Sequence, residues 1–196
     1  MKYNYHWYIN ENYKDPSFAW QDLLTKEECD QVIDLGLNNP IPMSIGKTGN
    51  EQTTVDDRKS KITWMPILDN NHWLFEKIVR AINYQNKKWW NYDLDFIESL
   101  QFTEYDSSYS GYYKAHTDTM YIQRFSRKLS FTIQLSDPTT YEGGDLKIFK
   151  SEVSEETIKT QGTIIFFPSF TLHEVTPVTN GTRYSLVGWV VGPKFK

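Results

Sequence analysis

The segment Leu129-Ser-Phe-Thr-Ile-Gln-Leu135 is the clearest indication of the fold in this chain. Apolar and polar residues alternate along it. Because successive side chains of a β-strand point to opposite faces, its four apolar residues share one face. The segment therefore predicts a strand that packs one face against an apolar core.

Short segments of similar character lie on both sides of this one. They comprise residues 97–105, 144–149, 163–167, 173–175 and 184–191. Turn-forming pairs such as Asp137-Pro138, Gly143-Gly144 and Asn180-Gly181 separate them. Such a run of short strands is typical of an antiparallel sandwich or jelly roll.

Two helices are predicted before the strands. Thr25-Lys-Glu-Glu28 is a capping box that starts the first, and Asn38-Asn39-Pro40 ends it. The second runs from about residue 71 to 87, and its periodicity places Leu74, Ile78, Val79 and Ile82 on the buried side. We expect one domain over residues 1–196, with helical support at about 20–95 and a jelly-roll core at about 96–192.

Between the helices, residues 44–61 are polar and read as a long exposed loop. A loop of this length in a compact domain is often functional. It is one candidate for the substrate side of a site. Further candidates are Tyr121, Arg124, Phe125 and Arg127, which follow the segment His116-Thr117-Asp118.

Composition excludes several classes of protein. The 196 residues carry 21 basic and 25 acidic side chains, a net charge of −4 that argues against a nucleic-acid binder. A single cysteine, Cys29, excludes an internal disulfide or a cysteine-rich metal site. The first 20 residues lack the apolar core of a signal peptide, and no segment approaches the roughly 20 apolar residues of a membrane span. We expect a soluble cytoplasmic protein, monomeric or homodimeric.

His116-Thr117-Asp118 is the sharpest local feature. On an extended segment, residues two apart point the same way, so an imidazole and a carboxylate converge. His173, at the end of a buried strand, can complete a group of two imidazoles and one carboxylate, which is the ligand set of non-haem Fe(II) oxygenases. The alternative for His116 and Asp118 alone is an ordinary surface pair. The alternative for His173 alone is a buried histidine with a purely structural role.

Arg183 lies in an apolar strand on the same face as Ser185, Val187 and Trp189. A buried guanidinium needs an anion, because an unpaired buried charge costs several kcal/mol. A carboxylate of a bound co-substrate would satisfy it in a bidentate manner, with Ser185 as a further donor. A structural ion pair with an acid of the protein is the alternative.

The order His116-x-Asp118, His173, Arg183-x-Ser185 resembles that of Fe(II)- and 2-oxoglutarate-dependent oxygenases. The similarity covers about residues 20–192 and is greatest to the prolyl 4-hydroxylase-like and PKHD-type members. Further similar segments are Leu23–Ile33, Arg58–Trp64, Gly111–His116, Leu135–Pro138, Tyr141–Gly144 and His173–Val178. Collagen-modifying prolyl hydroxylases usually carry lysine where Arg183 stands, so this chain departs from them.

The resemblance implies a double-stranded β-helix with Fe(II) held by His116, Asp118 and His173. It implies that Arg183 binds 2-oxoglutarate, that O2 is the oxidant, and that ascorbate can serve as reductant. Tyr105, Tyr113 and Ser185 are further candidates for binding 2-oxoglutarate, and Trp189 either packs behind it or fills the core. Tyr113 precedes His116 by three residues, so it reaches the site only if the strand bends near Lys114-Ala115.

The implied activity is hydroxylation of a C–H bond, coupled to conversion of 2-oxoglutarate to succinate and CO2. We expect a peptide or protein substrate, with proline as the first candidate. An oxygenase of a free amino acid or other small molecule is the second hypothesis, and a non-catalytic metal-binding jelly roll is the third. Fe(II)-dependent succinate formation separates the enzymes from the third, and peptide dependence separates the first two.

Overall fold

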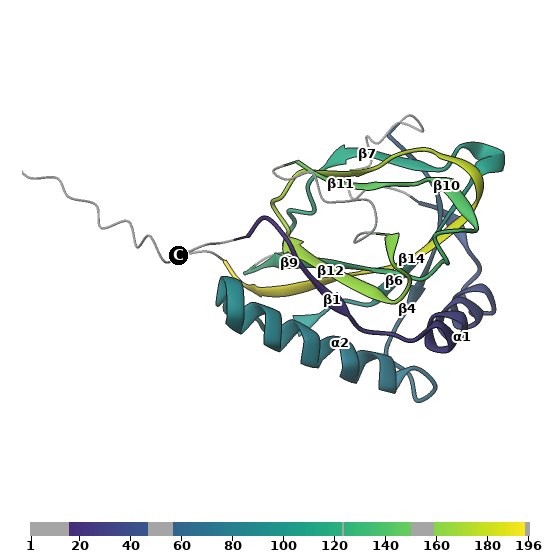
Figure 1. The fold of residues 1–196 in the computed structure, drawn as a ribbon. Coiled ribbons are helices and arrows are strands. Elements are labelled where there is room, and N and C mark those ends of the chain that lie inside the picture. The colour runs from purple at the N-terminus through teal and green to yellow at the C-terminus, as the bar shows by residue number, and fades with distance from the viewer. Residues whose placement is uncertain (1–15, 47–56, 123, 150–158, 195–196) are drawn as a thin grey trace, which may run out of the picture.

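The computed structural model describes residues 16–46, 57–122, 124–149 and 159–194. Two β-sheets face each other, and helices α1 (Lys26–Leu37) and α2 (His72–Gln85) lie against the outer face of the larger sheet (Figure 1). A π-helical turn, η1 (Asn86–Trp90), extends α2, and a 3-10 turn, η2 (Ser107–Tyr109), connects two strands. None of the helices in these ranges is long and apolar enough to cross a bilayer.

The larger sheet has a central path of seven strands in the described part of the chain. In spatial order they are β1 (Ala19–Asp22), β12 (Thr163–Pro168), β9 (Phe125–Gln134), β14 (Val178–Pro193), β6 (Leu100–Asp106), β4 (Lys61–Met65) and β2 (Ser44–Ile45). Short strands pair beside this path: β5 (Phe96–Ile97) and β10 (Tyr141–Gly143) on β14, and β8 (Tyr121–Ile122) on β9. All of these pairs are antiparallel.

The smaller sheet has four strands among the described residues. Their order is β11 (Leu146–Ile148), β13 (His173–Val175), β7 (Tyr112–His116) and β3 (Arg58–Lys59). The chain thus alternates between the two sheets as it proceeds, which is why residues far apart in sequence meet between them. The expected mostly-β fold with helices supporting one sheet is confirmed.

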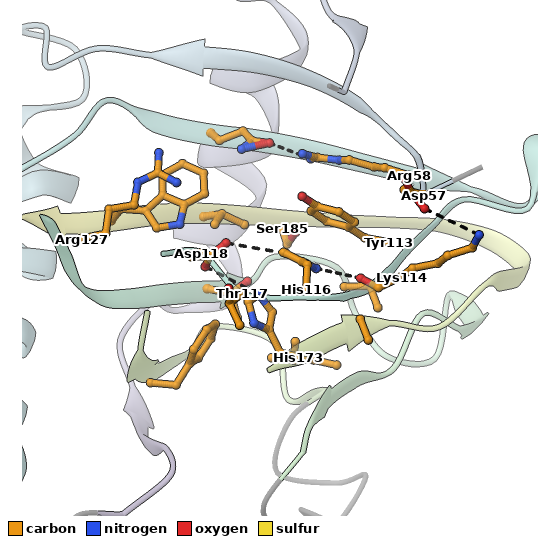
Figure 2. Close-up of a pocket in the computed structure, with 18 of the residues that line it drawn as sticks. Asp57, Arg58, Tyr113, Lys114, His116, Thr117, Asp118, Arg127, His173 and Ser185 are labelled. Carbon is orange, nitrogen blue, oxygen red and sulfur yellow. Dashed lines mark hydrogen bonds and ion pairs between the residues drawn. The ribbon is translucent and has the colours of Figure 1, made fainter. Parts of the chain in front are cut away.

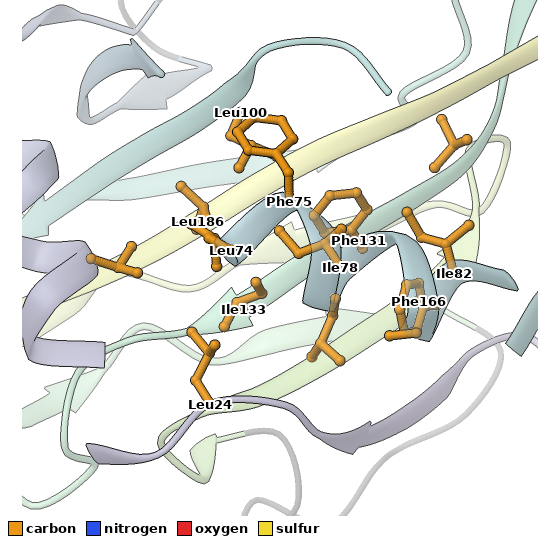
Figure 3. Close-up of a cluster of buried hydrophobic side chains, with 14 of the residues drawn as sticks. Leu24, Leu74, Phe75, Ile78, Ile82, Leu100, Phe131, Ile133, Phe166 and Leu186 are labelled. Atoms are coloured by element: carbon orange, nitrogen blue, oxygen red, sulfur yellow. The ribbon is translucent and has the colours of Figure 1, made fainter. Parts of the chain in front are cut away.

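The alternation along β9 determines what lies on each side of the larger sheet. Leu129, Phe131 and Ile133 are fully buried and belong to the core cluster that includes the helices, as their spacing predicts. Figure 3 shows Phe131 and Ile133 in this cluster. The intervening polar residues face the smaller sheet instead. Strands β6 and β14 follow the same pattern, with Phe102 and Leu186 on the helix side. One sheet therefore has an apolar outer face and an inner face on which polar side chains can be gathered.

A second apolar cluster joins the two sheets. It contains Ile165 and Phe167 of β12, Leu146 of β11 and Val175 of β13, all nearly inaccessible to solvent. These residues hold the sheets together by burying apolar surface, which contributes about 25 cal/mol per Å². The inter-sheet space is therefore apolar on one side and polar on the other.

The helix predictions are largely confirmed. Thr25 accepts a hydrogen bond from the Glu28 backbone, and the Glu28 carboxylate accepts one from the Thr25 N–H, which completes the capping box. In α2, Leu74, Ile78 and Ile82 are buried, but Val79 is 41% exposed, so its predicted burial is wrong. Phe75 takes the buried position, because the contact stripe of the helix turns toward that side.

The expected loop at residues 44–61 is part strand. Its first two residues form β2 in the larger sheet, and Arg58 and Lys59 form β3 in the smaller one. Residues 47–56 lie outside the described ranges. The expected exposure is wrong for Arg58, which is 7% exposed because β3 pairs with β7 and directs this side chain into the space between the sheets.

Candidate active site

The two predicted histidine ligands face each other across neighbouring strands. His116 ends β7 and His173 begins β13, and they are directly paired in the antiparallel register with ring centroids 4.2 Å apart. Asp118 follows β7, where its backbone N–H donates to the carbonyl of Ser169 at 2.8 Å. One potential ligand atom from each of the three residues lies within 4.8 Å of the others. The structure thus assembles the triad that the sequence predicts.

Backbone carbonyl groups orient both imidazoles. The Nδ1 atom of His116 lies 2.8 Å from the carbonyl oxygen of Lys114, and that of His173 lies 2.9 Å from the carbonyl oxygen of Thr171. A carbonyl can only accept, so each Nδ1 carries the proton and each Nε2 lone pair faces Asp118. Burial, and next the neighbouring His173, lower the pKa of His116 to about 4. His116 is therefore a neutral imidazole at neutral pH, as metal ligation requires.

Asp118 is buried, yet it is ionised. Burial by itself raises the pKa of a carboxyl group, but both histidines and a hydrogen bond from Ser130 outweigh it and hold the Asp118 pKa below its usual range. The Ser130 hydroxyl donates to Oδ2 at 2.7 Å, and the two Nε2 atoms each lie 3.6 Å from a carboxylate oxygen. Two imidazoles and one carboxylate are the donor set of a facial-triad Fe(II) site.

Arg183 is 1% exposed and lies opposite Tyr105 of β6. One of its terminal nitrogens donates to the side-chain oxygen of Gln134 at 2.9 Å. Its Nε and Nη1 atoms are buried with no hydrogen-bond partner among the described residues, and none of the acids there forms an ion pair with it. The structural ion pair that the sequence left open is thus absent from this part of the chain, and the guanidinium keeps two donor atoms for an incoming anion.

A cavity of about 880 Å³ between the sheets contains this group of residues (Figure 2). All eight residues singled out in the sequence line it: Tyr105, Tyr113, His116, Asp118, His173, Arg183, Ser185 and Trp189. The triad and the unpaired guanidinium therefore share one space. This arrangement accommodates a metal ion together with a dicarboxylate such as 2-oxoglutarate.

Tyr113 reaches the site because β7 is irregular. His173 pairs with His116 and Val175 with Tyr113, so two steps along β13 match three along β7. The extra residue is a β-bulge at the place where a bend is expected. It puts the Tyr113 ring against that of His116, with centroids 3.5 Å apart and the ring planes 17° apart.

Several cavity residues were not found by sequence reasoning. Gln101 and Trp64 line the cavity, and Ser130 and Gln134 hold its charged groups. The one signal that could have identified the last two is their alternation with the apolar residues of β9. Nothing local to the sequence indicates their partners.

Of the residues expected on the substrate side, two of the 44–61 segment, Asp57 and Arg58, line the cavity in the described part of the chain, and so does Arg127. The guanidinium of Arg127 lies 4.0 Å from the Trp189 ring centroid and pairs with both carboxylate oxygens of Glu98 at 2.7 Å. Arg124 instead lies over the ring of Phe125, away from the cavity lining. The side chain of Tyr121 lies outside the described structure.

Comparison with known proteins agrees with this site. Residues 100–191 match the model of the 2OG-Fe(II) oxygenase superfamily. A PKHD-type hydroxylase of Prochlorococcus marinus is 34% identical over 139 residues, which cover 68% of this chain and 56% of the relative. One from Synechococcus sp. strain CC9311 is 44% identical over 80 residues, covering 41% and 36%. The chain thus spans about half, or less, of the length of these relatives.

Solved structures share the fold at low sequence identity. A viral collagen prolyl hydroxylase from Paramecium bursaria Chlorella virus-1, in complex with 2-oxoglutarate, superposes with a TM-score of 0.67 at 19% identity, covering 90% of this chain and 97% of that one. A Trichoplax adhaerens prolyl hydroxylase bound to a peptide of hypoxia-inducible factor gives 0.69 at 18%, covering 89% and 83%. The predicted double-stranded β-helix is confirmed.

The fold and the site define a class of protein: a double-stranded β-helix with a two-histidine, one-carboxylate triad and a buried arginine in one cavity. Together with the sequence matches, they relate the chain to the 2-oxoglutarate- and Fe(II)-dependent oxygenase superfamily, with PKHD-type hydroxylases among the proteins that it resembles. This relationship implies Fe(II), 2-oxoglutarate and O2, and the residues of the cavity have the chemistry to hold the first two.

Proposed function

We propose that this protein is a 2-oxoglutarate-dependent dioxygenase that hydroxylates a C–H bond of a peptidyl residue, with proline as the first candidate. The observation that carries the proposal is the pair of unpartnered donor atoms on buried Arg183, in the cavity that holds His116, Asp118 and His173. A structural metal site alone has no need of an unpaired cation beside it, so the non-catalytic reading does not account for Arg183.

In this proposal the residues divide the work of binding. His116, Asp118 and His173 hold Fe(II), and Arg183 binds the distal carboxylate of 2-oxoglutarate with its Nε and Nη1 donors. When bound, Fe(II) supplies the O2 chemistry that couples loss of CO2 from 2-oxoglutarate to hydroxylation. Ser185 lies two residues further along β14 on the same face, where its hydroxyl can donate to the same carboxylate.

The remaining walls orient the ligands and exclude water. Phe167, Val175 and Leu146 provide an apolar wall from the inter-sheet cluster. The Tyr105 ring lies 5.4 Å from the guanidinium carbon of Arg183 and limits where a carboxylate can approach it. In such surroundings a charge-assisted hydrogen bond contributes about 1.5–3 kcal/mol. Arg183 therefore has enough interaction energy to determine the direction in which 2-oxoglutarate lies.

A peptide substrate is favoured by the neighbouring structures. The Trichoplax adhaerens prolyl hydroxylase, which has the same fold, was solved with a peptide bound. The cavity of this chain, at about 880 Å³, has room for a side chain in addition to a dicarboxylate. We therefore take a peptide or protein as the partner and retain a small-molecule substrate as the alternative.

Succinate formation tests the activity. Purified protein supplied with Fe(II), 2-oxoglutarate and O2 is expected to produce succinate, and His116→Ala is expected to abolish it. His72→Ala is the matched control, because His72 is an exposed residue at the start of α2 and does not line the cavity. Equal succinate formation by the wild type and the His116 variant would contradict the proposal.

The substrate class is tested with host proteins. Incubation with a lysate and mass spectrometry of its peptides is expected to reveal a mass gain of about 16 Da, for one added oxygen, that requires both Fe(II) and 2-oxoglutarate. Modified peptides that appear with the wild type and are absent with the His116 variant support a peptidyl hydroxylase. Succinate formation that responds to amino acids or metabolites but to none of the peptides would favour the alternative.

A further inference from the structure

The cavity contains a second buried arginine, Arg58. The ring of Tyr113 lies between this arginine and His116 of the triad. The guanidinium carbon of Arg58 lies 4.6 Å from the centroid of the Tyr113 ring, and that ring stacks on His116 (Figure 2). Arg58 is 7% exposed and lines the same cavity as Arg183. A positive charge this far from water requires a negative partner or strong dipoles.

Two neutral side chains hold Arg58 in place. Its Nε atom donates to the Ser60 hydroxyl at 2.6 Å, and one terminal nitrogen donates to the side-chain oxygen of Gln101 at 2.7 Å. Arg183 is held in the same way by the side-chain oxygen of Gln134. Gln134 lies on β9, which pairs with the strand of Arg183, whereas Gln101 lies on β6 of the larger sheet and Arg58 on β3 of the smaller one. In both cases a glutamine oxygen fixes the guanidinium without cancelling its charge. The two arginines thus share a neutral glutamine partner, but Nε of Arg58 donates to Ser60 whereas Nε of Arg183 has no partner among the described residues.

Acids within the described residues do not neutralise Arg58. Two of them line the cavity, Asp57 and Asp118. Asp57 pairs with Lys114 at 3.8 Å, and Asp118 lies between the two histidines. Neither forms an ion pair with Arg58, so its charge is uncompensated in the part of the chain that the structure describes.

We propose that Arg58 binds a carboxylate of the primary substrate. This rests on the proposed function, in which Arg183 takes one carboxylate of 2-oxoglutarate and the metal takes the other end of that molecule. The co-substrate then has no anionic group left for Arg58. The partner must come with the molecule that is hydroxylated, and the guanidinium fork suits a carboxylate. The Tyr113 ring sets the spacing between this carboxylate and the hydroxylated carbon.

The carboxylate has two possible sources: a free amino acid, or an acidic side chain of a peptide. We would titrate the Zn(II)- and 2-oxoglutarate-loaded protein, which cannot turn over, and follow its tryptophan fluorescence, since Trp64 and Trp189 line the cavity. One pair of probes is L-proline and L-prolinamide. The other is the acetylated and amidated peptide Ala-Pro-Glu-Ala and its glutamine counterpart. Each pair differs only in the charge of one group.

The carboxylate member of one pair is expected to bind about 10-fold or more tightly than its neutral partner, as for a charge-assisted bond. The pair that discriminates identifies the source. Arg58→Gln is expected to reduce the ratio to near one and to leave the affinity for 2-oxoglutarate unchanged. Arg80→Gln, which removes an exposed charge on α2, is expected to retain the ratio.

The proposal is overturned if the wild type binds the members of both pairs equally, or binds none of them. It is also overturned if the preference survives in Arg58→Gln. The wild-type comparison needs no variant, so it decides the matter even if that variant does not fold. None of these measurements requires turnover, so failure of the dioxygenase assignment would appear separately, as absence of succinate formation.

Discussion

The Ser130 hydroxyl donates a 2.7 Å hydrogen bond to Oδ2 of Asp118, and that same oxygen lies 3.6 Å from Nε2 of His173. Ser130 also contacts the hydroxyl of Ser169 at 3.1 Å, in the segment that receives the backbone N–H of Asp118. Protein groups of β9 and of the turn before β13 thus orient the carboxylate. A preformed ligand requires less reorganisation when the metal binds.

Ser130→Ala is expected to weaken metal binding about 10- to 100-fold, the range typical for loss of an outer hydrogen bond to a ligand. Competition with a chromophoric chelator for Zn(II) or Co(II) measures this directly. Ser126→Ala is the matched control: the Ser126 hydroxyl, on the same strand, is buried but has no hydrogen-bond partner in the described structure. Comparable metal affinity in the Ser130 variant and the control would show that the hydrogen bond does not orient Asp118.

Gln134→Glu is expected to close the site to 2-oxoglutarate. The new carboxylate would lie at hydrogen-bond distance from Arg183 and form the internal ion pair that the native structure avoids. We expect the affinity for 2-oxoglutarate to fall by about 10-fold or more. Calorimetric titration of the Zn(II)-loaded protein measures it. Gln31→Glu, an exposed change on α1 with the same charge, serves as control. Undiminished binding in the Gln134 variant would argue against Arg183 as the anchor.

The side of α2 that faces the sheet can be tested by two neighbouring substitutions. Ile78 is fully buried, so Ile78→Ala is expected to reduce the free energy of unfolding by about 2–5 kcal/mol. Val79 is 41% exposed, and Val79→Ala is expected to change it by no more than about 0.5 kcal/mol. Urea denaturation of the metal-free protein measures both. Comparable losses would mean that the helix is rotated relative to the structure.

Cys29 provides a probe of the same core and of its pH dependence. Burial, and next the charge of Asp30, raise the pKa of the Cys29 thiol to about 12. The folded protein at pH 8 is therefore expected to react with a thiol reagent far more slowly than urea-unfolded protein. Above pH 9 the unfolded thiol ionises while the folded one does not, so this group lowers stability as pH rises. Rapid labelling of the folded protein would contradict its burial.

The extent to which sequence predicted the site differs between residues. His116, Asp118, His173 and Arg183 were predicted from the sequence because few residue types bind iron or a carboxylate, and the structure brings them to one cavity. Ser130 and Gln134 were missed because serine and glutamine occur on many strands for ordinary reasons. They gain significance from the partner that the β9 register places opposite them.

For Arg58, too, the surroundings could not be predicted from the sequence. Its polar neighbours in sequence predicted an exposed loop, whereas pairing of β3 with β7 buries it beside Tyr113. Val79 was misassigned for a related reason, since helical periodicity defines a stripe but not the exact edge of the surface that covers it.

By itself the sequence determined the strand alternation and the helix cap, and it predicted the triad and its arginine, because these depend on local geometry and on the chemistry of single side chains. Only the tertiary structure decided which neutral groups hold the two buried guanidinium ions, where the β7 bulge places Tyr113, and that both charges face one cavity. Such relationships depend on the register between strands distant in sequence, and register is set by the packing of the whole sandwich.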